Sequence, residues 1–438
     1  MIFVNVLHRR RRMVGGALFF LALLLALPAS AETLTLERAW QLAEENNPQL
    51  RSARAALDTA EGELADSRGL LWNNPQLFAE RKRREVPQAS DPTQINREWG
   101  VGLSQTFEIA GQQGMRKSAA EQSLAATQEA IAETRRQLRA EVESRFVRVL
   151  SLQQRIGTEE QTVKLIEDAA AAVGKRVKAG EDSRLDGNLA KVEAERARNQ
   201  VAALREQLVQ ARAELATTLQ LPAATLPEVE GALDRGDRHT LEELMAAAQN
   251  RALLRALDHR EAAAKSRLDL ERASVYPDIT LGLASAREGS ADLREKVTGL
   301  SVSLPLPLFR RNATQIGRAS TEFTQAQIEK QAADRDVRAQ VTALWERLEN
   351  LQGRVKRLTE SVLPGLEENQ RLSVTAFRAG EIGLLQLLIV NRQVLDGQRD
   401  LLDARTELRF TRIALEAAAG WQPQERANNE IDRKEFTK

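Results

Sequence analysis

The sequence has no cysteine and almost no histidine, and these absences exclude several classes of function. Its 438 residues include three His and no Cys. Disulfides, thiolate metal sites and a lipid anchor on an N-terminal cysteine are therefore excluded. His239 and His259 are isolated in the sequence, whereas a metal site needs several converging ligands. We expect no metal site, no cofactor and no catalytic residues, because a glycine-rich phosphate loop and a nucleophile paired with a base are also missing.

The sequence also has few long apolar runs and no large excess of charge of one sign. The one long apolar run, residues 13–27, follows Arg9–Arg12 and leads to an Ala-Ser-Ala ending at Ala31. This arrangement predicts a signal peptide, residues 1–31, cleaved near Ala31, because the run falls short of the roughly 18 residues that a spanning helix needs. Removal of four arginines leaves 59 basic residues (63 − 4) against 62 acidic ones, a net charge of −3. This balance gives no reason to expect a nucleic-acid partner.

Aromatic residues make up only 4% of the chain, and the composition is dominated by residues typical of long helices packed side by side. From Val142 an apolar residue returns at every seventh position as far as Val177, and a similar row begins at Val341. Sustained heptads predict left-handed coiled-coil packing. Helices over residues 112–178 and 312–378 would each be about 100 Å long.

A repeat at an offset of about 200 residues divides the chain into two halves. The segment Val177–Glu181 matches Phe377–Glu381. In each copy a glycine follows alanine, which predicts a helix end where the chain reverses. We therefore predict two tandem structural repeats that share one topology. Their expected bounds are residues 32–230 with a helix tip at about 179–181, residues 231–420 with a helix tip at about 379–381, and a C-terminal tail at 421–438.

Proline should also shape the second long helix. Pro364-Gly365 lies inside its heptad pattern, and proline removes one backbone hydrogen bond and crowds the preceding turn. We expect a bend at this dipeptide.

Between the helices the apolar period changes from seven to two. Ile279, Leu281 and Leu283 alternate with small or polar residues, and the first repeat has the same pattern. We predict β-hairpins at about residues 75–110 and 277–308. The alternation fits transmembrane β-strands and, equally, a hairpin packed on soluble helices. Four strands cannot close a barrel in lipid, because known barrels need at least about eight, so a membrane location requires several copies of the chain.

Aromatic residues at the hairpin ends favour the membrane interpretation. Trp72 and Tyr276 precede the first strand of each hairpin, and Phe107 and Phe309 lie near the end of the second. All four should lie at one membrane boundary, as the girdle residues of barrels do. At the other end of the first strand, Arg81–Arg84 is either a solvated charged loop or a site for lipopolysaccharide phosphates.

A family resemblance is carried by the segments Leu34–Trp40 with Asn46–Leu50, Leu103–Gly111, Ser303–Asn312 and Arg378–Leu388. These segments resemble the outer-membrane efflux protein (TolC-like) family, and specifically its heavy-metal branch, the outer-membrane components of resistance-nodulation-division (RND) pumps. The resemblance implies a mainly α fold with a small β part. It implies a homotrimer with a 12-stranded barrel, four strands per chain, in outer-membrane lipid and a long coiled-coil α-helical barrel in the periplasm. The partners would be a periplasmic adaptor protein and an inner-membrane RND pump, and the function would be passive export of heavy-metal cations, not enzymatic catalysis.

The resemblance also places a periplasmic gate at the helix tips. The gate candidates are Asp182, Arg184, Asp186 and Gln386. Threefold symmetry would bring three copies of each acid toward the axis, where carboxylates repel one another, and Asp186 is our choice for the constricting acid. Gln386 and Ile389 stand where family members often carry acids. The alternative is an ordinary charged turn.

The same turns are the expected docking points for the adaptor. The candidates are Arg176, Gly180, Glu181, Arg378, Gly380 and Glu381. Helix capping explains the two glycines equally well.

Three alternatives stay open at this stage. A periplasmic adaptor also has a signal peptide and a long helical hairpin, but normally only one such hairpin, flanked by small β-domains. A coiled-coil tether leaves the alternating hairpins unexplained. Within the channel class, the cargo could be a drug rather than a metal ion.

Overall fold

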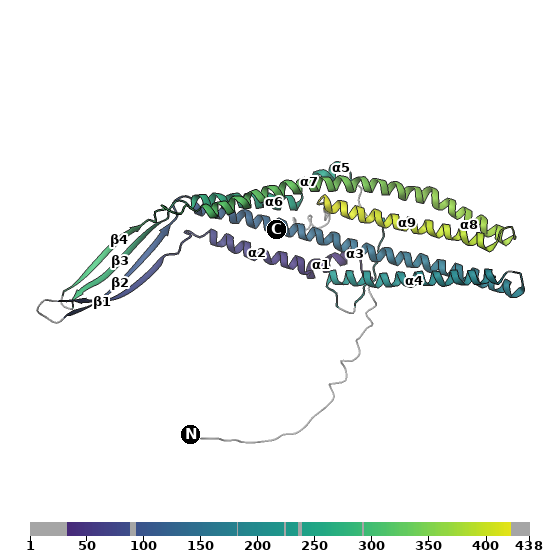
Figure 1. Cartoon of the computed structure of the whole chain (residues 1–438), viewed down its shortest axis with the longest axis horizontal. Coiled ribbons are helices and arrows are strands. Elements are labelled where there is room, and N and C mark those ends of the chain that lie inside the picture. The colour runs from purple at the N-terminus through teal and green to yellow at the C-terminus, as the bar shows by residue number, and fades with distance from the viewer. Residues whose placement is uncertain are drawn as a thin grey trace, which may run out of the picture.

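The computed structural model describes residues 33–421 apart from 88–92, 182, 223–224, 235–238 and 291–292. The signal peptide expected at residues 1–31 and nearly all of the expected C-terminal tail lie outside the described residues. The described chain forms a long, gently arched molecule with a narrow sheet at one end and paired helix tips at the other (Figure 1).

The chain uses the same order of elements twice, namely two helices, a hairpin, a long helix and a returning helix. In the first repeat these are α1 (Leu36–Asn46), α2 (Pro48–Ser67), β1 (Gln76–Val86), β2 (Gln94–Phe107), α3 (Gln112–Ala179) and α4 (Arg184–Leu219). In the second they are α5 (Leu241–Gln249), α6 (Ala252–Ala273), β3 (Ile279–Ser290), β4 (Leu293–Ser303), α7 (Ala313–Arg357), a π-helical turn η1 (Leu358–Val362), α8 (Leu363–Arg378) and α9 (Leu384–Ala418). The mainly α fold with a small β part is confirmed.

The four strands form one antiparallel sheet in the order β1-β2-β3-β4. The pairing of β2 with β3, from Trp99↔Arg287 to Phe107↔Ile279, joins the hairpins of the two repeats. Glycine allows close packing on one face, because a Cβ at position 102 would lie 2.3 Å from the ring of Phe78. Within the described chain, β1 and β4 have no partner on their outer edges. Unpaired edge groups are a template for pairing with another chain.

The long helix α3 is the spine of the molecule. Its 68 residues correspond to about 100 Å. Near the sheet α3 packs against α2 and α6, and toward the tips it packs against α4 and α9. Across residues 33–421 as described, none of the helices combines the length and the hydropathy that a membrane-spanning helix requires.

Two apolar cores lie where the short helices meet the long ones. Val142 and Val149 of the predicted heptad row are fully buried beside Leu215 of α4. In the second repeat Val341 packs with Leu244 and Leu415. The seam between α3 and α9, where the repeats meet, combines apolar contacts with ion pairs, since Ile413 of α9 belongs to the first core. Glu143 pairs with Arg409, and Glu159 accepts from Arg399 at 2.7 Å.

Proline changes two predicted elements. The second long helix does not simply bend at Pro364-Gly365, since it passes into the π-helical turn η1 just before the proline, where the N–H of Leu363 donates to the carbonyl of Leu358. The wider turn accommodates a residue that has no N–H to donate. The apolar alternation of the second hairpin runs to Leu308, but β4 ends at Ser303, because Pro305 and Pro307 cannot donate to the strand ladder.

Candidate functional site at the helix tips

The first tip, between α3 and α4, is a tightly closed turn. Gly180 has φ of 81°, a conformation that favours glycine. Its N–H donates to the carbonyl of Val177 at 3.2 Å, and the N–H of Glu181 donates to that of Arg176 at 2.9 Å. Both hydrogen bonds satisfy carbonyls that the helix end would otherwise leave open.

The second tip, between α8 and α9, repeats this geometry 200 residues later. Gly380 has φ of 79°, and the N–H of Glu381 donates to the carbonyl of Ala376 at 2.9 Å. Arg378, the last residue of α8, is exposed. The capping role expected for both glycines is present, so their glycine identity alone does not indicate a partner.

The two tips differ in how the returning helix begins. Ser183 caps α4: its hydroxyl accepts from the backbone N–H of Asp186 at 3.1 Å and lies 2.6 Å from the Asp186 carboxylate. The equivalent position before α9 is Gly383, which has no side chain to form a cap. Side-chain caps stabilise a helix start by about 1 kcal/mol, so the first tip is held more firmly than the second.

A contact between the tips holds them beside each other. The guanidinium of Arg176 lies over the ring of Phe377, 5.7 Å from its centroid, and it also lies 3.7 Å from the carboxylate of Glu181. Arg176 is a docking candidate on the sequence alone, but nothing in its own segment indicates its aromatic partner. The 200-residue offset of the two turns places Arg176 and Phe377 at neighbouring positions of the repeat, and it could have indicated that they lie at the same height along the molecule.

The gate candidates have different surroundings. Asp182 lies outside the described residues. Arg184 and Gln386 are exposed, and Asp186, whose N–H donates to the Ser183 cap, is half-buried. The structure therefore brings Arg184, Asp186 and Gln386 to the same end of the molecule, on the first turns of α4 and α9.

The four hairpin aromatics gather at the junction between sheet and helices. Trp72 lies between α2 and β1, Tyr276 between α6 and β3, Phe107 at the end of β2, and Phe309 between β4 and α7. Trp72 stacks under the guanidinium of Arg116, 3.9 Å from the ring centroid. Phe309 is 97% exposed, which is unusual for a phenylalanine facing water.

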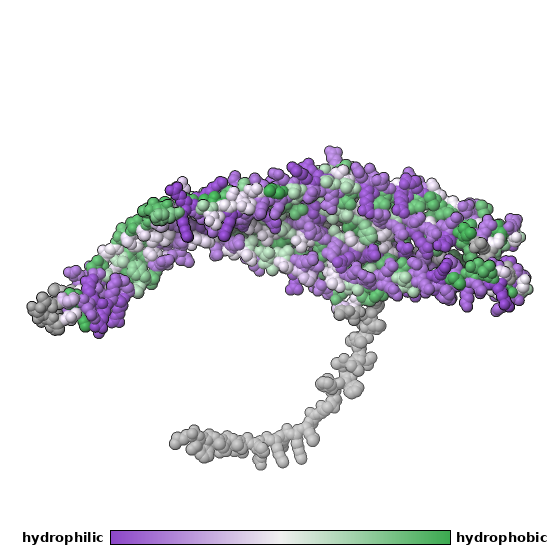
Figure 2. Space-filling model, in the orientation of Figure 1, coloured by the Kyte–Doolittle hydropathy of each residue, from purple (hydrophilic) through white to green (hydrophobic). Residues whose placement is uncertain are grey.

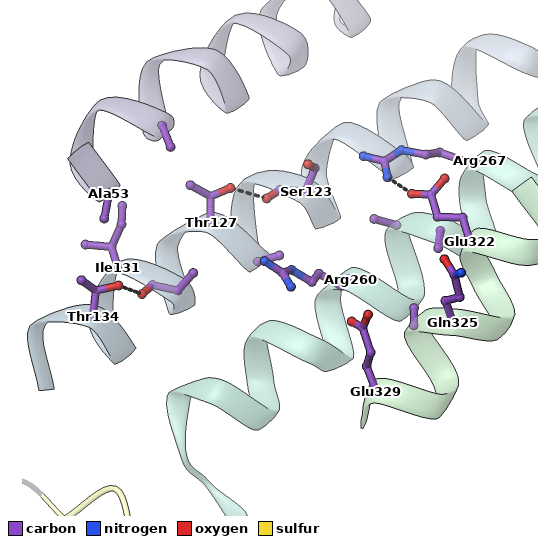
Figure 3. Close-up of a pocket in the computed structure, with 16 residues that line it drawn as sticks. Ala53, Ser123, Thr127, Ile131, Thr134, Arg260, Arg267, Glu322, Gln325 and Glu329 are labelled. Atoms are coloured by element: carbon purple, nitrogen blue, oxygen red, sulfur yellow. Dashed lines mark hydrogen bonds and ion pairs between the residues drawn. The ribbon is translucent and has the colours of Figure 1, made fainter. Parts of the chain in front are cut away.

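A polar groove lies between the two repeats where α2 and α3 face α6 and α7 (Figure 3). Its volume is about 480 Å³ and its lining is mostly alanine, hydroxyl and charged side chains. Thr127 and Thr134 donate to carbonyls of their own helix, and Arg267 pairs with Glu322 at 2.5 Å. These side chains already have partners, and the groove contains no nucleophile beside a base.

The two histidines lie in separate places. His239 packs against Trp421 with the rings tilted by 49° and their centroids 4.3 Å apart, and Nδ1 of His259 lies 2.7 Å from Oε1 of Gln122. Among the described residues no three His, Asp or Glu side chains are grouped so that they could hold a metal ion.

Comparison with known families decides between the classes left open by the sequence. The family model for outer membrane efflux proteins matches residues 39–219 and again residues 244–421. The chain belongs to the outer membrane efflux protein family. It is therefore an outer-membrane efflux channel and a passive conduit, not an enzyme, a periplasmic adaptor or a simple coiled-coil tether.

Individual relatives agree with this membership. The chain is 29% identical over 381 residues to the cobalt-zinc-cadmium resistance protein CzcC of Cupriavidus metallidurans, covering 86% of each chain. Among solved structures, a membrane protein from Pseudomonas aeruginosa superposes with a TM-score of 0.75 at 21% identity, covering 88% of this chain and 92% of that one. CusC superposes with a TM-score of 0.74 at 19% identity over the same shares. The two structural matches support the fold.

Proposed function

We propose that three copies of this channel form the outer-membrane duct of a tripartite RND-type efflux system that exports heavy-metal cations. The observation that supports this most directly is the four-stranded sheet with two open edges. An open edge cannot persist in lipid, because its backbone groups would have no hydrogen-bond partners. Three copies joined β4 to β1 would complete a closed barrel of twelve strands.

In this arrangement the helices extend into the periplasm, and residues 1–31 serve as the export signal. The long helices of three chains would enclose a wide, water-filled channel. The polar groove between α3 and α6 would form part of its lining. Apolar residues and the aromatics Trp72, Phe107, Tyr276 and Phe309 would place the sheet in the membrane, with the aromatics at its periplasmic boundary. Energy and ion selection would come from the inner-membrane pump.

Heavy-metal cargo is supported by the similarity to CzcC, whose name refers to cobalt, zinc and cadmium resistance. Deletion of the gene in its native host should raise sensitivity to divalent metal ions and leave sensitivity to lipophilic drugs unchanged. The reverse result would assign the channel to a drug-type pump.

The gate of the duct would lie at the tips. Three copies of Asp186 near the threefold axis, with Asp182 and Arg184 beside them and Gln386 on the neighbouring tip, would form the constriction. Charge reversal by Asp186→Lys should change the single-channel conductance or its block by polyvalent cations, whereas Glu193→Lys, on the same helix farther from the tip, should change neither. An unchanged conductance and block in Asp186→Lys would remove this residue from the gate.

Docking of the adaptor would use the exposed turn residues of both tips, namely Arg176, Gly180, Glu181, Arg378, Gly380 and Glu381. A bulky residue in Gly380→Trp should abolish metal resistance while the trimer remains assembled. Because Gly380 also needs its left-handed backbone, Glu381→Trp provides a second test that keeps the glycine. Retained resistance in both assembled variants would refute docking at this turn.

A further inference from the structure

The strand register sorts the charged residues of the hairpins onto two faces. Side chains of directly paired residues lie on the same face of a sheet, and successive residues alternate. On β2 the even positions Asn96, Glu98, Gly100 and Gly102 are buried, and the odd positions from 95 to 103 are exposed. We name these the inner face and the outer face.

Close to the helices the outer face is apolar. Leu103 pairs with Leu77 on one side and with Leu283 on the other, and Leu283 pairs with Leu300. These leucines are all exposed. Figure 2 shows this apolar surface as a green band over the part of the sheet that adjoins the helices.

Beyond the apolar band the same face becomes basic. Trp99 pairs with Arg81 and with Arg287, and the Arg287 guanidinium lies 5.6 Å from the Trp99 ring centroid. The outer-face cations are Arg81, Arg83, Arg97, Arg287, Arg294 and Lys296. Glu85 is the one acid that this register places among them, so the described part of this basic belt carries a net charge of +5 (6 − 1). A hydrophilic patch is visible near the hairpin turns in Figure 2.

The inner face has the opposite balance. Lys82 and Arg84, which alternate with Arg81 and Arg83 along β1, lie there beside acids. Lys82 is 2.6 Å from Glu80, and Arg84 is 3.3 Å from the buried Glu98 and 3.7 Å from Glu288. The run Arg81–Arg84 is therefore not one cluster, because Lys82 and Arg84 pair with acids on the inner face, whereas Arg81 and Arg83 belong to the basic belt. Within the belt, Arg83 lies 2.9 Å from Glu85, the acid already counted in its net charge.

The position of the belt matches that of lipid headgroups. Phe107 and Trp99 are eight residues apart on β2 (107 − 99), or about 26 Å before strand tilt is considered, close to the ~25 Å apolar band of outer-membrane barrels. Guanidinium groups bind phosphate bidentately. We infer that the basic belt binds the phosphate groups of lipopolysaccharide in the outer leaflet, with Trp99 at the boundary between acyl chains and headgroups. The inference rests on the proposed membrane position of the sheet.

Two matched double variants on one strand test the inference. R81Q/R83Q removes two charges from the outer face, and K82Q/R84Q removes two from the inner face. Binding of fluorescent lipopolysaccharide to the purified trimer would be measured for both, with phosphatase-treated lipopolysaccharide and inorganic pyrophosphate as further probes. At about 1 kcal/mol per cation near an anionic surface, R81Q/R83Q should bind intact lipopolysaccharide about 30-fold more weakly. K82Q/R84Q should bind it as the unaltered protein does.

The remaining outcomes separate the possible sources of binding. Phosphatase treatment should weaken binding to the unaltered trimer, and pyrophosphate should not compete at equal concentration. Equal losses in the two double variants, no loss in R81Q/R83Q, or equally tight binding of pyrophosphate would each overturn the inference. If R81Q/R83Q does not assemble, R97Q/R287Q on β2 and β3 gives the same test. Conductance in phosphatidylcholine bilayers is recorded in parallel, because its absence in the unaltered protein would contradict the proposed channel rather than the lipid site.

Discussion

Glu133 of α3 and Arg251, the residue that precedes α6, form a buried ion pair between the two repeats, with Oε1 and Nη2 2.7 Å apart. Arg136 donates to the same carboxylate from within α3, and Arg251 also donates to the carbonyl of Ala418 at 3.1 Å. Glu133 and Arg251 together thus link α3, the start of α6 and the end of α9. In the first repeat the equivalent joint is neutral, because the Asn47 side chain donates to the carbonyl of Thr218 at 3.3 Å.

Removal of the Glu133 charge should destabilise the protein strongly. Glu133→Gln would leave two buried arginines without their shared carboxylate, and loss of one partner of a buried pair costs about 3–5 kcal/mol. Glu129→Gln is the control, since the Glu129–Arg255 pair is partly exposed and should contribute less than about 1 kcal/mol. Chemical denaturation of the detergent-solubilised protein would measure the free energy of unfolding of both variants. Comparable losses would show that the buried ion pair contributes no more stability than the partly exposed one.

The same group predicts an acid-dependent loss of stability. Burial opposes ionisation of Glu133, but hydrogen bonds from Arg136 and Arg251 outweigh it and lower the pKa from 4.5 to about 2. A lowered pKa in the folded state gives stability that is present above the unfolded pKa and lost as the pH falls through the folded one. The free energy of unfolding should therefore decline between about pH 4.5 and pH 2, and the decline should be shallower in Glu133→Gln. Parallel profiles for the two proteins would contradict this role.

Packing of α8 against α9 should depend on the small size of Gly397. A Cβ at this position would lie 2.6 Å from Cδ1 of Leu366 and 3.4 Å from Cδ2 of Leu363. Gly397→Leu should therefore lower the free energy of unfolding by about 1–3 kcal/mol through overpacking. Gly365→Leu, where the structure leaves open space around the added Cβ, should cause a much smaller loss. Equal effects of the two substitutions would show that α9 does not need a glycine here.

If the two tips move apart when the channel opens, the contact between them should favour the closed state. The Arg176–Phe377 interaction is of a kind worth about 0.5–1 kcal/mol at exposed sites, so Arg176→Gln should raise the open probability about two- to fivefold. Lys178→Gln removes a charge from the same helix end and serves as the control. Single-channel recording would compare them, and an equal rise in both variants would indicate a general charge effect.

Much of the architecture follows from the sequence because it depends on local periodicity. Seven-residue spacing from Val142 predicted α3, and the alternation around Leu281 predicted a strand. Gly180 and Gly380 predicted both tips, because a left-handed turn after a helix is a local property that favours glycine.

The features that the sequence did not predict depend on contacts between distant segments. Alternation along the strand separates Arg81 from Lys82, but the pairing of β1 with β2 decides which of them shares a face with acids. Arg84 is neutralised by Glu98 and by Glu288, which comes from the other repeat. Arg251 lies in the short connection between α5 and α6, and nothing local indicates that Glu133 lies beside it. The assignment of Asp186 to the gate remains a prediction, because a single chain places it at the tip but does not define the threefold axis.

The most direct test of the shared barrel is the molar mass of the mature protein in detergent, measured by light scattering with the detergent contribution subtracted. Three chains per particle, resistant to dissociation until heated, are the predicted result. A monomer that stays soluble in water without detergent would contradict a barrel completed by several copies, and with it the proposed conduit.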